Sequence, residues 1–155
     1  MSRLRLAIAA DHAGAALKAA IVARVGQIAP EWSVTDLGGD GSDPTDDYPD
    51  SARAVAERMI AGHADRGLVI CGSGIGVTIA ANKFHGIRAS IAHDPASAEQ
   101  GVVHDSMNVL SLGAKVVDLP TASAVLAAFL GATPSDAERF VRRTKKVRQI
   151  EEEQG

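Results

Sequence analysis

The chain has 155 residues, of which 46% are hydrophobic and 23% are charged, with a net charge of −3 at pH 7. This size suits one globular domain over residues 1–155, with a substantial core and no room for a second domain. The slight acidity argues against a general nucleic-acid or acidic-membrane surface, so the expected partner is a small molecule. A lone cysteine, the lack of an apolar run of ~18 residues and the lack of a signal core make the cytoplasm the expected location.

Short apolar runs alternate with helix-like segments along the chain. Strands are expected at Leu4–Ala10, Ser33–Asp36, Leu68–Ile70, Ile87–Ala92 and Asn108–Leu112. Helices are expected at Ala13–Ile28, at Ser51–Ala61 with Asp50 as its cap, from Pro95 to Gly101, at Thr121–Leu130, and from Pro134 onward. A further helix-like segment follows the third strand. This alternation predicts an α/β protein with a parallel sheet covered on both faces.

The polar residues just after the strands are the first candidates for a site, because ligands of open α/β sheets bind at the carboxyl ends of the strands. The first strand delivers Asp11 and His12, and the fourth delivers His93 and Asp94. The third strand delivers a dense group, namely Cys71, Gly72, Ser73, Gly74 and Gly76. His104 and Asp105 lie just before the fifth strand. Packing alone does not account for so many polar groups, so a catalytic role is favoured.

Cys71 and the glycine-rich turn after it are the most informative part of the chain. Glycines let backbone N–H groups converge on an anion, and a helix N-terminus beside a thiol favours the thiolate. One loop therefore offers both a base and an oxyanion hole. The alternatives are an inert buried thiol, or half of a dinucleotide fingerprint, although GSGIG follows the third strand here. A cysteine phosphatase loop would need an arginine, and residues 72–78 contain none.

The remaining histidines and the late arginines are ambiguous by themselves. His12 and His104 could each be satisfied structural residues, and His63 and His85 are expected on the surface. No histidine pair has the i, i+4 spacing of a zinc site, so no metal is expected. Arg139 and Arg143 are one helical turn apart, which suits either a phosphate clamp or a solvated helix face.

Several motifs, spread over nearly the whole chain, resemble the family of ribose-5-phosphate isomerase B and galactose-6-phosphate isomerase. They are AADHAG at 9–14, DYPD at 47–50, CGSGIGVTIAANK at 71–83, GIRA at 86–89, His104 followed by NVL at 108–110, LGAKVV at 112–117, and the late arginines. The resemblance implies a three-layer α/β/α Rossmann-like domain with a five-stranded parallel sheet and a C-terminal helix that reaches the partner subunit. It also implies a homodimer or a dimer of dimers, active sites between subunits, a phosphorylated sugar as substrate, and no cofactor or metal.

The same resemblance implies a role for individual residues. Cys71 would be the base that moves a proton between C1 and C2 through a cis-enediolate, and Ser73 and His104 would open the sugar ring. The phosphate would be held by His12, Arg139 and Arg143. Asp11 would bind sugar hydroxyls. The amides of Gly72, Gly74, Ile75 and Gly76 would stabilise the enediolate oxygen, and Tyr48, Asp105 and Lys115 would complete the substrate-binding set.

Several positions depart from the family pattern: Ser73 stands for threonine, Asp105 for asparagine and Lys115 for arginine. Near the end, Ala137-Glu138-Arg139-Phe140 stands where Gly-Gly-Arg-His is usual, after an apparent insertion of one residue. Ser73 keeps the hydroxyl. The carboxylate of Asp105 would repel a phosphate or an enediolate, and Lys115 loses bidentate geometry. Ribose 5-phosphate is the expected substrate. Allose or galactose 6-phosphate, a tetrose phosphate, and a non-catalytic sugar-phosphate-binding subunit are the alternatives.

Overall fold

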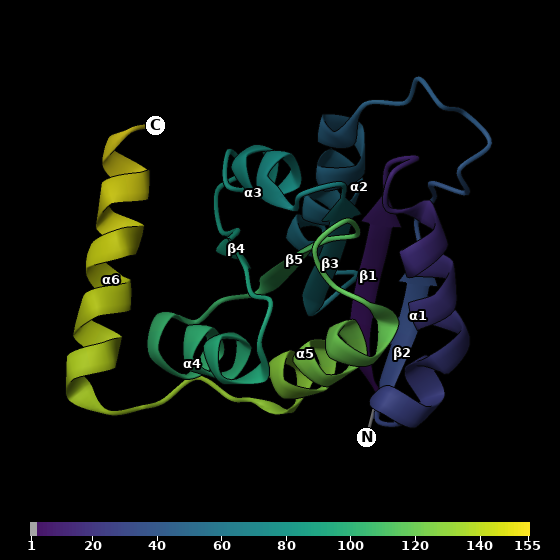
Figure 1. The fold of residues 1–155 in the computed structure, drawn as a ribbon. Coiled ribbons are helices and arrows are strands. Elements are labelled where there is room, and N and C mark those ends of the chain that lie inside the picture. The colour runs from purple at the N-terminus through teal and green to yellow at the C-terminus, as the bar shows by residue number, and fades with distance from the viewer. Residues whose placement is uncertain (1–2) are drawn as a thin grey trace.

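The computed structural model describes residues 3–155, which form a parallel sheet of five strands in the order β2-β1-β3-β5-β4 (Figure 1). The strands are β1 (Leu4–Ala10), β2 (Trp32–Asp36), β3 (Arg66–Cys71), β4 (Ala89–Ile91) and β5 (Val109–Gly113). β1, β3 and β5 lie in the middle of the sheet, and most of their residues are apolar and buried because both of their faces are covered.

Helices cover both faces of this sheet, as the alternation of elements predicted. They are α1 (Ala15–Ile28), α2 (Tyr48–Ile60), α3 (Ile75–Ala81), α4 (Pro95–Asp105), α5 (Leu119–Gly131) and α6 (Glu138–Glu153). Residues of α1, α4 and α5 share one buried cluster with alternate residues of β1, β3 and β5, whereas α2 and α3 share the other. Cys71 belongs to the cluster with α2 and α3. The predicted α/β/α class with a five-stranded parallel sheet is confirmed.

The last helix, α6, projects away from the sheet and contacts α4 near its start (Figure 1). Phe140, near its start, is its one buried residue within the described part of the chain. Val141, Val147 and Ile150 are about half exposed or more, at 49%, 54% and 60%. A helix with this much exposed apolar surface has a face that the rest of its own chain does not cover.

Several expected boundaries were wrong, and each error has a local cause. The helix expected at Ser51–Ala61 begins at Tyr48 with Asp47 as its N-cap, because Pro49 fits the first turn, and Asp50 lies inside the helix. The helix expected from Pro134 begins only at Glu138. The fourth strand is restricted to Ala89–Ile91 at the sheet edge, and the first helix begins at Ala15, after a turn.

A buried lysine fixes the chain where β2 leaves the sheet. Lys18 is 3% exposed, and its Nζ donates to Oδ1 of Asp36 at 2.6 Å and to the carbonyl oxygen of Gly38 at 3.0 Å. Both acceptors lie at the beginning of the loop that joins β2 to α2. The pair therefore anchors this loop to α1, since a buried ammonium group is tolerated only while its hydrogen bonds are satisfied.

We expect Lys18→Met to lower the free energy of unfolding by about 1–3 kcal/mol, because it removes two hydrogen bonds made by a buried charge. Urea denaturation of Lys18→Met, Asp36→Asn and the double variant measures the coupling between the two residues. The double variant should cost less than the sum of the single variants. Additive losses would show that Lys18 and Asp36 do not stabilise the fold as a pair.

Candidate active site

The carboxyl ends of β1 and β3 lie side by side and bring two turns together. Ala10 pairs with Ile70 in the parallel register, and the amide of Asp11 donates to the carbonyl oxygen of Ile70 at 3.3 Å. Gly14 closes the first turn, because a Cβ there would lie 2.5 Å from the same carbonyl oxygen. Asp11 is 7% exposed and accepts from the Gly14 amide at 3.1 Å. Its carboxylate thus shapes the turn directly after β1.

Cys71 ends β3, and its thiol lies against the turn that follows. The side chain is 4% exposed, and the Gly74 amide donates to Sγ at 3.2 Å. Ser73 is exposed, and its Oγ accepts from the Ile75 amide at 3.1 Å. Gly74 has φ of +82°, a left-handed conformation that glycine adopts without a steric penalty. The turn therefore holds backbone amides beside a buried thiol, which is an arrangement suited to a base next to an oxyanion.

Tyr48 and Lys115 flank this turn, as the predicted substrate-binding set requires. A Cβ on Gly76 would lie 2.7 Å from Cζ of Tyr48, so the phenol ring packs directly over that glycine. A Cβ on Gly72 would lie 3.6 Å from Cδ and Cε of Lys115, whose amide also donates to the Gly72 carbonyl at 3.0 Å. Both residues therefore contact the Cys71 turn from other elements.

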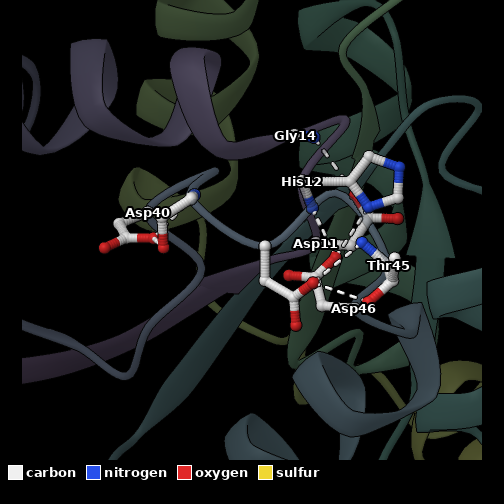
Figure 2. Close-up of polar contacts among 8 residues, drawn as sticks. Asp11, His12, Gly14, Asp40, Thr45 and Asp46 are labelled. Carbon is white, nitrogen blue, oxygen red and sulfur yellow. Dashed lines mark hydrogen bonds and ion pairs between the residues drawn. The ribbon is translucent and has the colours of Figure 1, made fainter.

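His12 is held by an aspartate that the sequence did not single out (Figure 2). Oδ1 of Asp46 lies 2.7 Å from Nδ1 of His12 and also accepts from the His12 amide at 2.8 Å. The hydrogen bond that the ring donates to Asp46 raises the pKa of His12 above its ordinary value, and the charge of Asp11 adds to this shift. Asp46 is one of several acids in a turn-rich loop, 34 residues from His12 in the sequence. Nothing in the sequence distinguishes it from the other acids, so its contact with His12 could not be predicted.

The other predicted site residues form a second cluster around Phe140. The ring of His104 stacks on Phe140 with 4.2 Å between ring centroids and 11° between planes. The guanidinium carbons of Arg139 and Arg143 lie 4.3 and 5.9 Å from the centroid of the same ring. Asp105 is exposed at the end of α4. This cluster gathers one imidazole and two cations, a combination suited to an anionic group.

Within one chain the two clusters lie at opposite ends of the strands, the Cys71 cluster at the carboxyl ends and the His104 cluster at the amino ends. Cys71 pairs with Gly113, the last residue of β5, whereas His104 comes five residues before β5 begins. The strand alone spans roughly 13 Å. The predicted residues Asp11, His12, Tyr48, Cys71–Gly76 and Lys115 are therefore brought together, and His104, Asp105, Arg139 and Arg143 are brought together separately.

Three further observations concern the rest of the described chain. Within residues 3–155, no three or more His, Cys, Asp or Glu side chains are grouped as a metal site would need. No helix in that range has both the length and the apolarity for crossing a membrane. His93, which the sequence left ambiguous, accepts from the Gly113 amide through Nε2 at 3.2 Å and so supports the end of β5.

Comparison with known proteins identifies the family. A family model described as Ribose/Galactose Isomerase matches residues 6–147. The chain belongs to this family. It is 40% identical to ribose-5-phosphate isomerase B of Escherichia coli over 148 residues, which cover 96% of this chain and 97% of that protein. It is 43% identical to D-erythrulose-4-phosphate isomerase 2 of Mycolicibacterium smegmatis over 128 residues, or 83% and 84% of the two chains.

Solved structures of the Ribose/Galactose Isomerase family share the whole fold. The structure of a mutant of Trypanosoma cruzi type B ribose 5-phosphate isomerase has a TM-score of 0.94 at 33% identity, with 100% of both chains covered. Ribose-5-phosphate isomerase B of Mycoplasma genitalium, solved with bound ribulose-5-phosphate, has a TM-score of 0.88 at 34% identity, with 99% of both covered. The resemblance seen in the sequence is confirmed, and the chain is an isomerase.

We expect Gly74→Ala to damage the Cys71 turn. The new Cβ would meet the carbonyl carbon of Leu112 at 3.0 Å, and the left-handed φ would be strained, at a cost of roughly 1–3 kcal/mol. Gly72→Ala is the matched control for stability, because the contacts of its Cβ begin at 3.6 Å. Thermal unfolding of both variants measures the difference, and equal melting temperatures would show that Gly74 does not need its conformation.

Proposed function

We propose that this isomerase interconverts ribose 5-phosphate and ribulose 5-phosphate, with Cys71 as the base. The observation that carries the proposal is the buried thiol at the end of β3, hydrogen-bonded to an amide of the turn that follows it. The membership of the family, which includes ribose-5-phosphate isomerase B of Escherichia coli, supports the substrate. Aldose–ketose isomerisation needs a base near both carbons and hydrogen-bond donors at the developing oxyanion, and this turn offers both.

The reaction needs no co-reactant, because substrate and product are isomers. After ring opening by Ser73 and His104, the thiolate of Cys71 takes the proton from C2 of the open-chain aldose. The electron pair forms the double bond of a cis-enediolate, whose oxygen accepts from amides of residues 72–76. The proton then returns to C1, and a second proton moves from O2 to O1, which gives the ketose. Loss of one oxyanion donor would cost roughly 10²–10³ in rate.

The residues of the second cluster would complete each site across the interface of a homodimer. His104, Arg139 and Arg143 gather around Phe140 at the amino ends of the strands, whereas Cys71 lies at the carboxyl ends. The projection of α6 supports such an assembly, because Val147 and Ile150 line an open groove of about 890 Å³ between α6 and the β4 side of the fold. A partner subunit that covers this face could present its own His104 cluster to the Cys71 turn.

The phosphate would then be bound by His12 together with the arginines of the partner subunit. Arg139 and Arg143 lie one turn apart on α6, and both guanidinium groups contact the Phe140 ring. Two guanidinium groups and a cationic imidazole suit a phosphate dianion.

A tetrose phosphate is the second candidate substrate. The Mycolicibacterium smegmatis relative at 43% identity is a D-erythrulose-4-phosphate isomerase. Asp105, which stands where the family pattern has asparagine, is exposed beside His104, so that its carboxylate would meet the sugar and favour a different hydroxyl pattern. Erythrulose 4-phosphate, allose 6-phosphate and galactose 6-phosphate therefore belong in the first assay beside ribose 5-phosphate.

Cys71→Ala should abolish isomerisation and leave the fold intact, because the thiol is small and the oxyanion donors are backbone groups. NMR of ribose 5-phosphate in heavy water measures both ribulose 5-phosphate and exchange at C2. Thermal unfolding is the control, with Cys71→Ser as a matched variant that keeps a polar atom. Residual turnover near the wild-type level would rule out the cysteine base. A protein inactive on all four sugar phosphates would instead support a binding subunit.

Mixing two inactive variants tests whether the site is shared between subunits. Cys71→Ala and His104→Asn impair different halves of the proposed site, so a hybrid dimer would keep one site with both residues intact. Unfolding and refolding an equal mixture should restore about a quarter of wild-type activity, since half of the dimers are hybrids and half of their sites are intact. Each variant refolded alone is the control, and no recovery in the mixture would contradict the shared site.

A further inference from the structure

The pair formed by His12 and Asp46 joins two segments that are 34 residues apart in the sequence. His12 belongs to the turn after β1, and Asp46 to the loop between β2 and α2. One carboxylate oxygen contacts both the ring nitrogen Nδ1 and the backbone amide of His12, at 2.7 and 2.8 Å. These two contacts fix the position of the ring, and within residues 3–155 no hydrogen bond involves its other nitrogen, Nε2.

The loop that carries Asp46 is held in place by other hydrogen bonds, so the position of Asp46 beside His12 is set by the loop. Lys18 anchors its beginning at Asp36 and Gly38. Asp43 then accepts from the amide and hydroxyl of Thr45, at 2.9 and 2.6 Å. Figure 2 shows Asp46 beside His12 and Asp40 well away from it. The loop thus places one carboxylate, among several, on the imidazole.

We propose that Asp46 is a positioning residue that presents His12 as a cationic donor to the phosphate group of the substrate. The inference rests on the proposed function, in which His12 binds that phosphate. With Nδ1–H donated to Asp46, a neutral ring would show only a lone pair at Nε2, which repels a phosphate dianion. The protonated ring keeps the Asp46 contact and donates from Nε2. Asp46 therefore selects the ring state that binds an anion.

The charged groups around His12 act in the same direction. Asp46 and Asp11 both favour the protonated ring and raise the pKa of His12. The pKa of Asp43 is lowered mainly by its hydrogen bonds from Thr45, and the charge of the nearby His12 adds a smaller effect in the same direction. These three acids would repel a phosphate if His12 were neutral. Binding of the phosphate to this edge therefore depends on His12 staying charged at pH values above its ordinary pKa.

A purely structural pair would behave differently with pH. Because the pKa of His12 is raised by folding, the pair stabilises the protein fully below the ordinary pKa, and this contribution is lost as the pH rises through the raised value. That dependence appears in unfolding but not in the KM of an already folded enzyme. The ratio of KM values between variant and wild type at several pH values is therefore the decisive readout.

The test compares Asp46→Asn with Asp40→Asn, a substitution in the same loop away from His12. KM for ribose 5-phosphate is measured from pH 6 to pH 8 for the wild type and both variants. Titration of the phosphate itself affects all three proteins alike and cancels in the ratio. We expect the Asp46→Asn to wild-type KM ratio to be near one at pH 6 and roughly three- to tenfold at pH 8. The Asp40→Asn ratio should stay near one throughout.

An NMR titration of the histidine rings accompanies the kinetics, with the His12 signal assigned by its loss in His12→Asn. The pKa of His12 should be lower in Asp46→Asn than in the wild type and unchanged in Asp40→Asn. An unchanged pKa in Asp46→Asn, or a KM ratio that does not depend on pH, would overturn the role of Asp46 in an active enzyme. A wild-type protein that does not turn over ribose 5-phosphate would instead reject the proposed function, and the inference with it.

Discussion

The adjacency of β1 and β3 in the sheet is the constraint on which the site depends. Because the two strands are parallel and paired from Leu6 to Ala10, they end together, and the turns after them emerge at one place. The turn after β1 even uses the carbonyl oxygen of Ile70 as an acceptor. Any change of strand order or register would separate Asp11 and His12 from Cys71. Backbone pairing thus decides which of the predicted site residues lie close together.

The same topology explains why one chain holds two separate polar clusters. In an α/β sheet, each helix returns the chain to the amino ends of the strands. Residues that end a helix therefore lie at the amino ends of the strands, whereas residues that end a strand lie at the carboxyl ends. His104 ends α4, and Cys71 ends β3. His104 and Cys71 of one chain therefore lie at opposite ends of the strands. In the proposed function a second copy of the chain would supply His104 together with the two arginines that the projecting α6 carries.

Much of the fold could be predicted because it is recorded in local patterns. The five strands were predicted from short apolar runs between turn residues, and the Cys71 turn from its glycines. The errors came where local signals compete. Asp50 and Asp47 both suit a helix cap, and the proline between them decides in favour of the earlier one. The edge strand β4 was predicted too long because Ile87 and Ala92, which flank it, are apolar for packing in the core rather than for pairing in the sheet.

The contacts that tune the site could not be predicted, because they join residues far apart in the sequence through side-chain geometry. Nothing local distinguishes Asp46 from Asp43 or Asp40, which make short-range turns with Thr45 and Ser42. Only the folded loop shows that one of them reaches His12. A loop rich in aspartate would repel a phosphate unless a cation lies between the carboxylates and the substrate. In the proposed function His12 is that cation, because the hydrogen bond to Asp46 and the charge of Asp11 raise its pKa.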